Sequence, residues 1–189
     1  MQTSLFTDAE IPTVSPAFTK QLLPAAAVDK GAAFSDCRKY RYALWRIWDE
    51  SKPLVMFIGL NPSTANEADD DPTIKSVCRI AKTNGYGGVY MMNCFPYVST
   101  DPTKLKDGLT LETNTNNVEK LKEIGARCKD VVFAWGNFKE VGEYVSGLLS
   151  NMFPSAKALF INKNGSPKHP LYCKSNTKLV NWNTSSTCI

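Results

Sequence analysis

The segment that decides the fold is Leu54–Leu60, LVMFIGL, an uninterrupted apolar run that leads directly into the turn 61–65, NPSTA. A short run that is apolar at every position predicts a strand buried on both faces, as in a parallel sheet with helices on each side. Ligands of such folds bind at the carboxyl ends of the strands. A functional site is therefore expected directly after Leu60.

Three further apolar runs repeat this pattern along the chain, at Val89–Cys94, Val131–Trp135 and Ala158–Ile161. An alternating segment, Arg41–Trp48, precedes the first run and predicts one more strand. We therefore expect a central, mostly parallel four-stranded sheet with an N-terminal strand or arm beside it.

Helical patterns separate these strands. Asp71 and Pro72 are typical of an N-cap and a first helical residue. Apolar residues at helical spacing define three segments: Ile74, Val77, Cys78 and Ala81; Val118, Leu121 and Ile124, ending near Gly125; and Val141, Tyr144, Val145, Leu148 and Leu149, with Asn137 as the expected cap. Helices alternating with parallel strands predict an α/β fold with three layers.

The chain has 189 residues and an ordinary globular composition, with 43% hydrophobic and 21% charged residues. This length suits one domain, which we place at residues 36–189. Residues 1–35 contain three prolines and no sustained periodicity, which predicts an N-terminal arm with a short helix near Phe18–Leu23. Because neither a signal peptide nor a membrane-spanning apolar run is present, we expect a cytoplasmic protein that binds no membrane.

Charge is unevenly distributed around the single histidine, His169. No Asp or Glu follows Glu143, whereas that last quarter of the chain contains Lys157, Lys163, Lys168, Lys174 and Lys178. The net charge of +4 therefore arises entirely from this segment. Two interpretations stay open, a solvated lysine-bearing surface and an anion-facing edge that binds phosphates.

Metal or cofactor chemistry has little support. None of the six cysteines forms a CxxC pair, and we expect reduced, buried thiols at Cys78, Cys94 and Cys128. The acidic run 69–71 can bind Mg²⁺, but helix capping explains it more simply. The phosphate-binding patterns GxGxxG and GxxxxGK[ST] and the nucleophile pattern GxSxG are all missing from the sequence. We therefore expect no metal and no cofactor.

Amide and imidazole groups follow the predicted strands. Asn61 follows the first strand, Asn93 ends the second, and His169 lies in a loop after the fourth. Each has a simpler structural role available: Asn61 as a turn cap, Asn93 as a loop tie and His169 as a loop histidine. Their convergence at one sheet edge favours a binding or catalytic site.

Four segments together resemble the mismatch-specific (thymine/uracil) branch of the uracil-DNA glycosylase superfamily. They are GLNP at 59–62, the strand end MNC at 92–94, VVFAWG at 131–136 and His169-Pro170, in the order of that superfamily. The likeness is greatest to a bacterial and phage family of unknown function with LNPSTA, DDPT, NCFPY-like, AWG and HPLY segments, and it covers Tyr40 to Trp182. The resemblance implies a uracil-DNA glycosylase-like fold.

The resemblance also implies roles for individual residues. Asn61 would position the hydrolytic water, His169 would stabilise the leaving base, and Asn93 would read the base edge. Phe95 or Tyr97 would stack on the base. The other candidate substrate-binding residues are Leu60, Pro62, Ser63, Thr64, Lys168, Leu171 and Tyr172. In the family, the HPS segment is followed by residues that grip DNA, and this chain has HPLY in its place. The substrate can therefore be a free or modified nucleotide instead of DNA.

Three functions follow from these observations. The favoured one is a hydrolase that cleaves the N-glycosidic bond of a base in DNA or in a nucleotide. The alternative is a non-catalytic nucleotide- or nucleic-acid-binding module on the same fold. A third is a protein-interaction domain whose arm, residues 1–35, makes the contacts. The sequence leaves the oligomeric state open.

Overall fold

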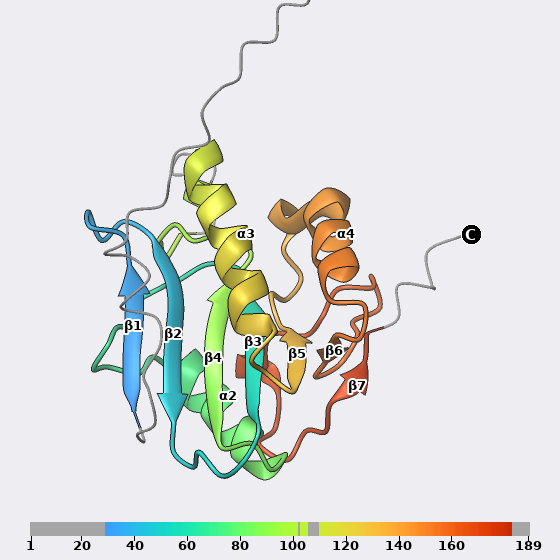
Figure 1. Cartoon of the computed structure of the whole chain (residues 1–189). Helices are drawn as coiled ribbons and strands as arrows, with labels where there is room; N and C mark the ends of the chain where they lie inside the picture. Colours follow the sequence, from blue (N-terminus) through green and yellow to red (C-terminus); the bar gives the residue numbers. More distant parts are fainter. Residues whose placement is uncertain (1–28, 102, 106–109, 183–189) are drawn as a thin grey trace, which may run out of the picture.

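The apolar runs of the sequence form the centre of a single sheet in the computed structural model (Figure 1). The structure describes residues 29–101, 103–105 and 110–182. The predicted short helix near Phe18–Leu23 lies outside the described residues, as does most of the predicted arm.

The sheet of the described residues has seven strands in the order β1-β2-β4-β3-β5-β6-β7. Their bounds are β1 Lys30–Phe34, β2 Arg41–Ile47, β3 Leu54–Gly59, β4 Gly88–Asn93, β5 Asp130–Phe133, β6 Lys157–Ala158 and β7 Val180–Asn181. β3 pairs in parallel with both β4 and β5, and β5 pairs in parallel with β6. The parallel centre thus consists of the four strands predicted from the apolar runs.

The prediction of a four-stranded sheet is nevertheless wrong, because antiparallel strands extend both edges. β2 pairs antiparallel with β4, β1 with β2, and β7 with β6. β1 lies within the segment predicted as an arm. It is mostly small residues, KGAAF, and Gly31 is packed against the Trp45 ring, so its sequence carries no strong apolar signal. The fourth predicted strand, Ala158–Ile161, is also shifted: β6 ends at Ala158, and Ile161 forms only an isolated bridge to Pro167.

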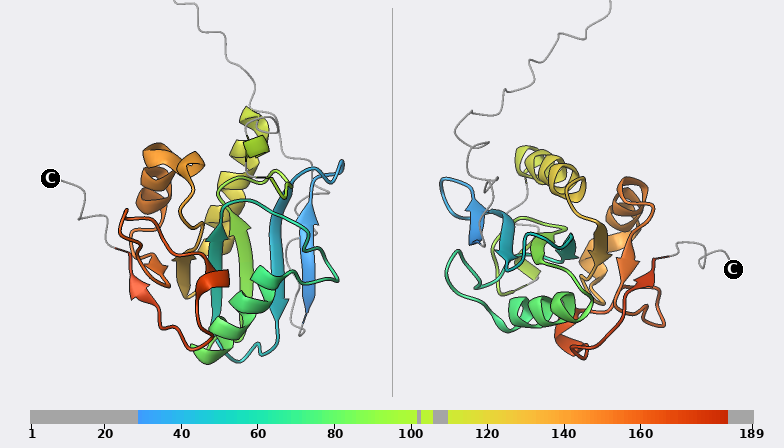
Figure 2. Two further views of the ribbon diagram at one scale, coloured as in Figure 1. Left: turned by 180° about the vertical axis from the view of Figure 1, so that it is seen from behind. Right: turned by 60° about the horizontal axis from the view of Figure 1, so that its bottom comes forward.

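Within the described residues, three α-helices cover the two faces of the sheet. They are α2 Pro72–Thr83, α3 Leu111–Gly125 and α4 Gly142–Met152. Figures 1 and 2 show α3 and α4 on one face and α2 on the other, beside the short 3-10 helix η3, Pro170–Tyr172. The three layers, the start of α2 at Pro72 and the end of α3 at Gly125 agree with the prediction, whereas α3 begins at Leu111, well before the predicted Val118.

The predicted cap of the third helix is wrong. A 3-10 turn, η2 Lys139–Val141, with Phe138 at its own cap position, precedes α4, and the N-cap residue of α4 is Val141 rather than Asn137. The Asn137 side chain instead accepts a hydrogen bond from Asn164. Leu148, predicted on the buried face of this helix, is exposed.

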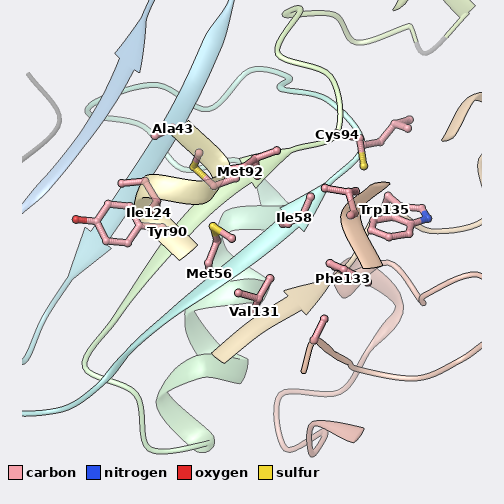
Figure 3. Packing of buried hydrophobic residues seen from close by; sticks show 14 of the residues in the cluster. Ala43, Met56, Ile58, Tyr90, Met92, Cys94, Ile124, Val131, Phe133 and Trp135 are labelled. Carbon is pink, nitrogen blue, oxygen red and sulfur yellow. The ribbon is translucent and has the colours of Figure 1, made fainter. Parts of the chain in front are cut away.

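Each face of the sheet has its own apolar core. Alternate residues of β3 divide between them: Met56 and Ile58 face α3 and α4, whereas Val55 and Phe57 face α2. The core beneath α3 and α4 contains the labelled residues of Figure 3, including Tyr90, Phe133 and Trp135. A strand buried on both sides explains why LVMFIG carries no polar residue.

Candidate functional site

A small cavity lies at the carboxyl edge of the parallel strands. Its volume is about 150 Å³. A cavity of about 150 Å³ in another protein binds benzene, so this volume is enough for one aromatic ring. Polar residues dominate its wall. They are Arg41, Asn61, Ser63, Asp71, Thr73, Asn93, Ser99, Thr100 and His169, with Gly59, Leu60, Ile74, Met91 and Phe138 as the remainder.

Asn93, the last residue of β4, is buried in this cavity wall without a partner. Its side chain is 1% exposed, and neither Oδ1 nor Nδ2 has a hydrogen-bond partner among the described residues. Gly59 of the neighbouring strand makes room for it, because a Cβ there would lie 3.1 Å from Asn93 Oδ1. Buried amides are almost always hydrogen-bonded. The donor and the acceptor of the Asn93 amide are therefore both left unpaired at the cavity wall.

Asn61 presents an acceptor to the same cavity. Its Nδ2 donates to the carbonyl oxygens of Pro62 (2.9 Å) and Ser99 (2.7 Å). These two bonds fix the amide plane and leave Oδ1 without a donor among the described residues. Asn61 is thus both the turn anchor and an oriented acceptor that can hold a water molecule.

His169 is positioned by the loop that precedes η3. Its Nδ1 accepts the backbone N–H of Leu171 at 3.3 Å, so the neutral ring carries its proton on Nε2. Burial lowers the pKa of His169, and the carboxylate of Asp71 opposes that shift only in part. Ser76 of α2 donates to the Pro170 carbonyl at 2.9 Å and ties the loop to the helix. His169 is therefore a neutral hydrogen-bond donor at neutral pH.

Gly136 allows the histidine loop to come this close. It has a φ of +80°, and a Cβ at this position would lie 3.2 Å from the Cβ of His169. This glycine ends the VVFAWG segment, so its conformation links that motif to the histidine.

Two charged residues of the cavity were not among the predicted site residues. Asp71 caps α2 as predicted, since its Oδ1 accepts the N–H of Ile74 at 2.9 Å, but it also lines the cavity. Arg41, the first residue of β2, lines it too. Because β2 runs antiparallel to β4, it begins at the edge where the parallel strands end. A search limited to strand ends misses such a residue, although an arginine that opens a buried strand is a usable signal.

A second, larger hollow of about 370 Å³ adjoins the cavity. Both are lined by Phe138 and His169. The second hollow also has two lysines, an exposed aromatic ring and three amides in its wall, namely Lys163, Lys168, Tyr172, Asn137, Asn162 and Asn164, together with Gly136. No acidic residue lines it among the described residues. This is the region of the molecule where the predicted basic edge meets the histidine.

The structure brings seven predicted site residues to these hollows: Leu60, Asn61, Ser63, Asn93, Lys168, His169 and Tyr172. Five others line neither: Pro62, Thr64, Phe95, Tyr97 and Leu171. Phe95 packs against the core beneath α3 and α4, and the Tyr97 ring lies 5.8 Å from that of Tyr40. The aromatic ring in the cavity wall is instead Phe138, which the sequence patterns did not single out.

The thiols are free at each of the five cysteines that the structure describes. Burial raises the pKa of Cys78 to about 11 and that of Cys128 to about 12, so both stay protonated. Cys94 is the most buried of the three, and burial raises its pKa further. In the same part of the chain, no group of three or more His, Cys, Asp or Glu side chains is arranged to hold a metal ion, and no helix has the length and apolar character to cross a membrane.

The structure thus shows an α/β protein with a small polar cavity at the carboxyl edge of a mixed sheet. The chain belongs to a family described as a protein of unknown function (DUF1643), whose model matches residues 41–171. This match begins at Arg41 and includes every predicted site residue except Tyr172. No curated protein and no solved structure matches the chain.

Proposed function

We propose that this protein is an N-glycosidic-bond hydrolase that removes a base from a nucleotide or from DNA. The observation that carries the proposal is the open amide of Asn93, fully buried in a ring-sized cavity that Asn61 and His169 also line. An amide with a free donor and a free acceptor pairs with the edge of a nucleobase. We also propose that the domain shares the fold of the uracil-DNA glycosylase superfamily, on the basis of the motif order given above.

The chemistry divides among the cavity residues. Asn61 Oδ1 orients a water molecule toward C1′ of the sugar, and the carboxylate of Asp71 accepts the proton of that water. The C1′–N bond breaks, its electron pair leaves with the base, and a C1′–OH bond forms. The Nε2–H of His169 donates a hydrogen bond to the base as negative charge develops there.

The second hollow supports a nucleotide rather than a free base as the substrate. Lys163 and Lys168 provide positive charge for a phosphate, and Tyr172 provides an exposed ring for stacking. Since His169 and Phe138 are common to both hollows, a base in the cavity places its sugar near them and its phosphate beyond.

Mass-spectrometric detection of base release from a panel of modified DNA and nucleotides tests this function. Asn61→Ala and His169→Ala should each abolish release while circular dichroism shows an unchanged fold. Asn114→Ala, an exposed asparagine on α3, is the matched control and should retain full activity. Full activity in both cavity variants would exclude the mechanism.

One observation favours the alternative, a non-catalytic nucleotide-binding module. The Nδ2 of Asn61 is fully engaged with backbone carbonyls, as expected for a residue that only shapes the loop. Tight binding of an intact nucleotide, recovered unchanged after long incubation, would establish this function in place of hydrolysis.

A further inference from the structure

Arg41 is a buried guanidinium for which the described residues provide no carboxylate partner. The residue is 3% exposed, its Nη1 donates to the Ala65 carbonyl at 2.6 Å, and its Nε has no partner. Burial lowers the pKa of Arg41 to about 10, and the negative charge of Asp71 opposes this shift. Arg41 therefore stays protonated at neutral pH. A buried charge without a counter-ion is costly and therefore rare.

Arg46, on the same strand, shows what a satisfied arginine looks like here. Its Nε donates to Asp70 at 2.8 Å, and its two Nη groups donate to the carbonyls of Gly31, Trp45 and Asn66. The same part of the fold thus supplies one arginine with a full set of partners and leaves the other open. This contrast leaves the Arg41 guanidinium without a counter-ion among the described residues.

The open side of Arg41 belongs to the cavity. Its backbone N–H donates to the Pro96 carbonyl at 2.9 Å, which fixes the residue beside the end of β4, and its side chain lines the wall together with Asn93. Among the described residues of that wall, Arg41 is the only full positive charge, because His169 is neutral at neutral pH. The one carboxylate there, Asp71, is engaged with the α2 N-terminus.

We propose that Arg41 is a second catalytic residue, which acts beside His169 and supplies the positive charge that neutralises the negative charge of the departing base. This inference rests on the proposed hydrolase function and adds to it a residue and a requirement on the substrate. When the C1′–N bond breaks, the electron pair moves onto the base, and the protonated guanidinium neutralises that charge without transferring its own proton. The base anion takes a proton from solvent after release, and the proton of the attacking water goes to Asp71.

A consequence is that Arg41 matters most for bases that leave poorly. The less acidic the departing base, the more charge stabilisation its release needs. Loss of one preorganised charge-stabilising group typically costs about 100- to 1,000-fold in rate. We expect a loss of this size in Arg41→Met for bases of low acidity and a much smaller loss for acidic bases, so that the rate depends more steeply on base acidity.

The test compares Arg41→Met and Arg41→Lys with Arg79→Met, an exposed arginine on α2 as control. Base release is measured on nucleotides whose bases differ in acidity, with circular dichroism to establish folding. Arg41→Met should show the steeper dependence, Arg41→Lys an intermediate one, and Arg79→Met that of the wild type. An unchanged slope in a folded Arg41→Met overturns the proposal.

Binding of the free base as a function of pH provides a readout that does not need catalysis. The wild type should bind 5-nitrouracil, an acidic analogue of uracil, more tightly as pH rises through the pKa of that analogue, which lies well below the pKa of Arg41, and Arg41→Met should lose this preference for the anion. If the wild type releases no base but shows this preference, the hydrolase function fails while Arg41 is retained as an anion receptor. If the wild type releases bases and Arg41→Met shows neither the steeper slope nor the lost preference, only the role of Arg41 is overturned.

Discussion

The two arginines of β2 differ in how the fold treats a buried charge. Arg46 has Asp70 and three backbone carbonyls as partners, whereas Arg41 has one carbonyl and an open Nε. A paired charge holds the β2 edge and the segment 66–70 together. A buried charge without a counter-ion lowers stability, and we propose that a ligand in the cavity completes the Arg41 guanidinium. Within one strand, we therefore expect Arg46 to stabilise the fold and Arg41 to bind the ligand.

Loss of Arg46 should have the largest effect on stability. Arg46→Met leaves Asp70 and three carbonyls without their donor, and we expect the free energy of unfolding to fall by about 3 kcal/mol. Arg41→Met removes an unpaired buried charge and should change it by no more than about 1 kcal/mol. Chemical denaturation of both variants measures the difference, and equal losses would show that the two arginines do the same work.

Two buried asparagines sharpen the same contrast. Asn117 of α3 donates from Nδ2 to the carbonyls of Asn93 and Cys94, at 3.0 and 3.2 Å, and only its Oδ1 has no partner among the described residues, whereas both polar atoms of the Asn93 side chain have none. We expect Asn117→Leu to destabilise by about 2 kcal/mol, and Asn93→Leu to be neutral or slightly stabilising. Thermal unfolding and base release are measured together. Asn93→Leu should lose activity at full stability, and a large loss of stability would mean that the amide is structural.

Two glycines with positive φ, Gly136 and Gly142, differ in whether they contact the histidine loop. A Cβ added at Gly136 would lie close to the Cβ of His169. A Cβ added at Gly142 would have no atom within 4 Å. Each alanine variant should cost about 1–2 kcal/mol. Only Gly136→Ala should also reduce base release, because it displaces His169. Equal activities would show that the loop position does not matter.

The smallest expected effect is the pH dependence contributed by His169. Burial lowers its pKa from the ordinary 6.5, so the unfolded chain binds more protons than the folded one in this range. Its contribution to stability is therefore present above pH 6.5 and is lost as pH falls through the lowered value. His169→Gln should remove this component from the pH dependence of unfolding. Since the chain has one histidine, an unchanged profile between about pH 5.5 and 7.5 would contradict the burial of the ring.

Much of the fold could be predicted because local patterns determine it. The four apolar runs mark the parallel strands, and Asp71-Pro72 marks the start of α2. The edges could not be predicted in the same way. β1 and β7 are short and weakly apolar, and they are strands only because a neighbour with free backbone groups is beside them. Such pairing depends on the tertiary structure rather than on the residues themselves.

The site was predictable to the same degree and for a related reason. Asn61, Asn93 and His169 were found because strand ends meet at one edge. Arg41 and Asp71 were missed as site residues, the first because it opens an antiparallel strand and the second because capping already explains it. Whether a buried polar side chain has a hydrogen-bond partner depends on residues far away in sequence. A local sequence pattern therefore cannot predict it.

The most direct test of ligand binding by Arg41 follows the side chains of Arg41 and Arg46 in the same titration. An isotope-labelled sample is titrated at neutral pH with 5-nitrouracil, a uracil analogue acidic enough to be an anion there, while the Nε–H resonances of Arg41 and Arg46 are recorded by NMR. We expect the Arg41 resonance to shift until binding saturates and that of Arg46 to stay in place. If the Arg41 resonance is unmoved at saturating 5-nitrouracil, or both resonances move together, the cavity does not hold a base against the Arg41 guanidinium, and the central claim is contradicted.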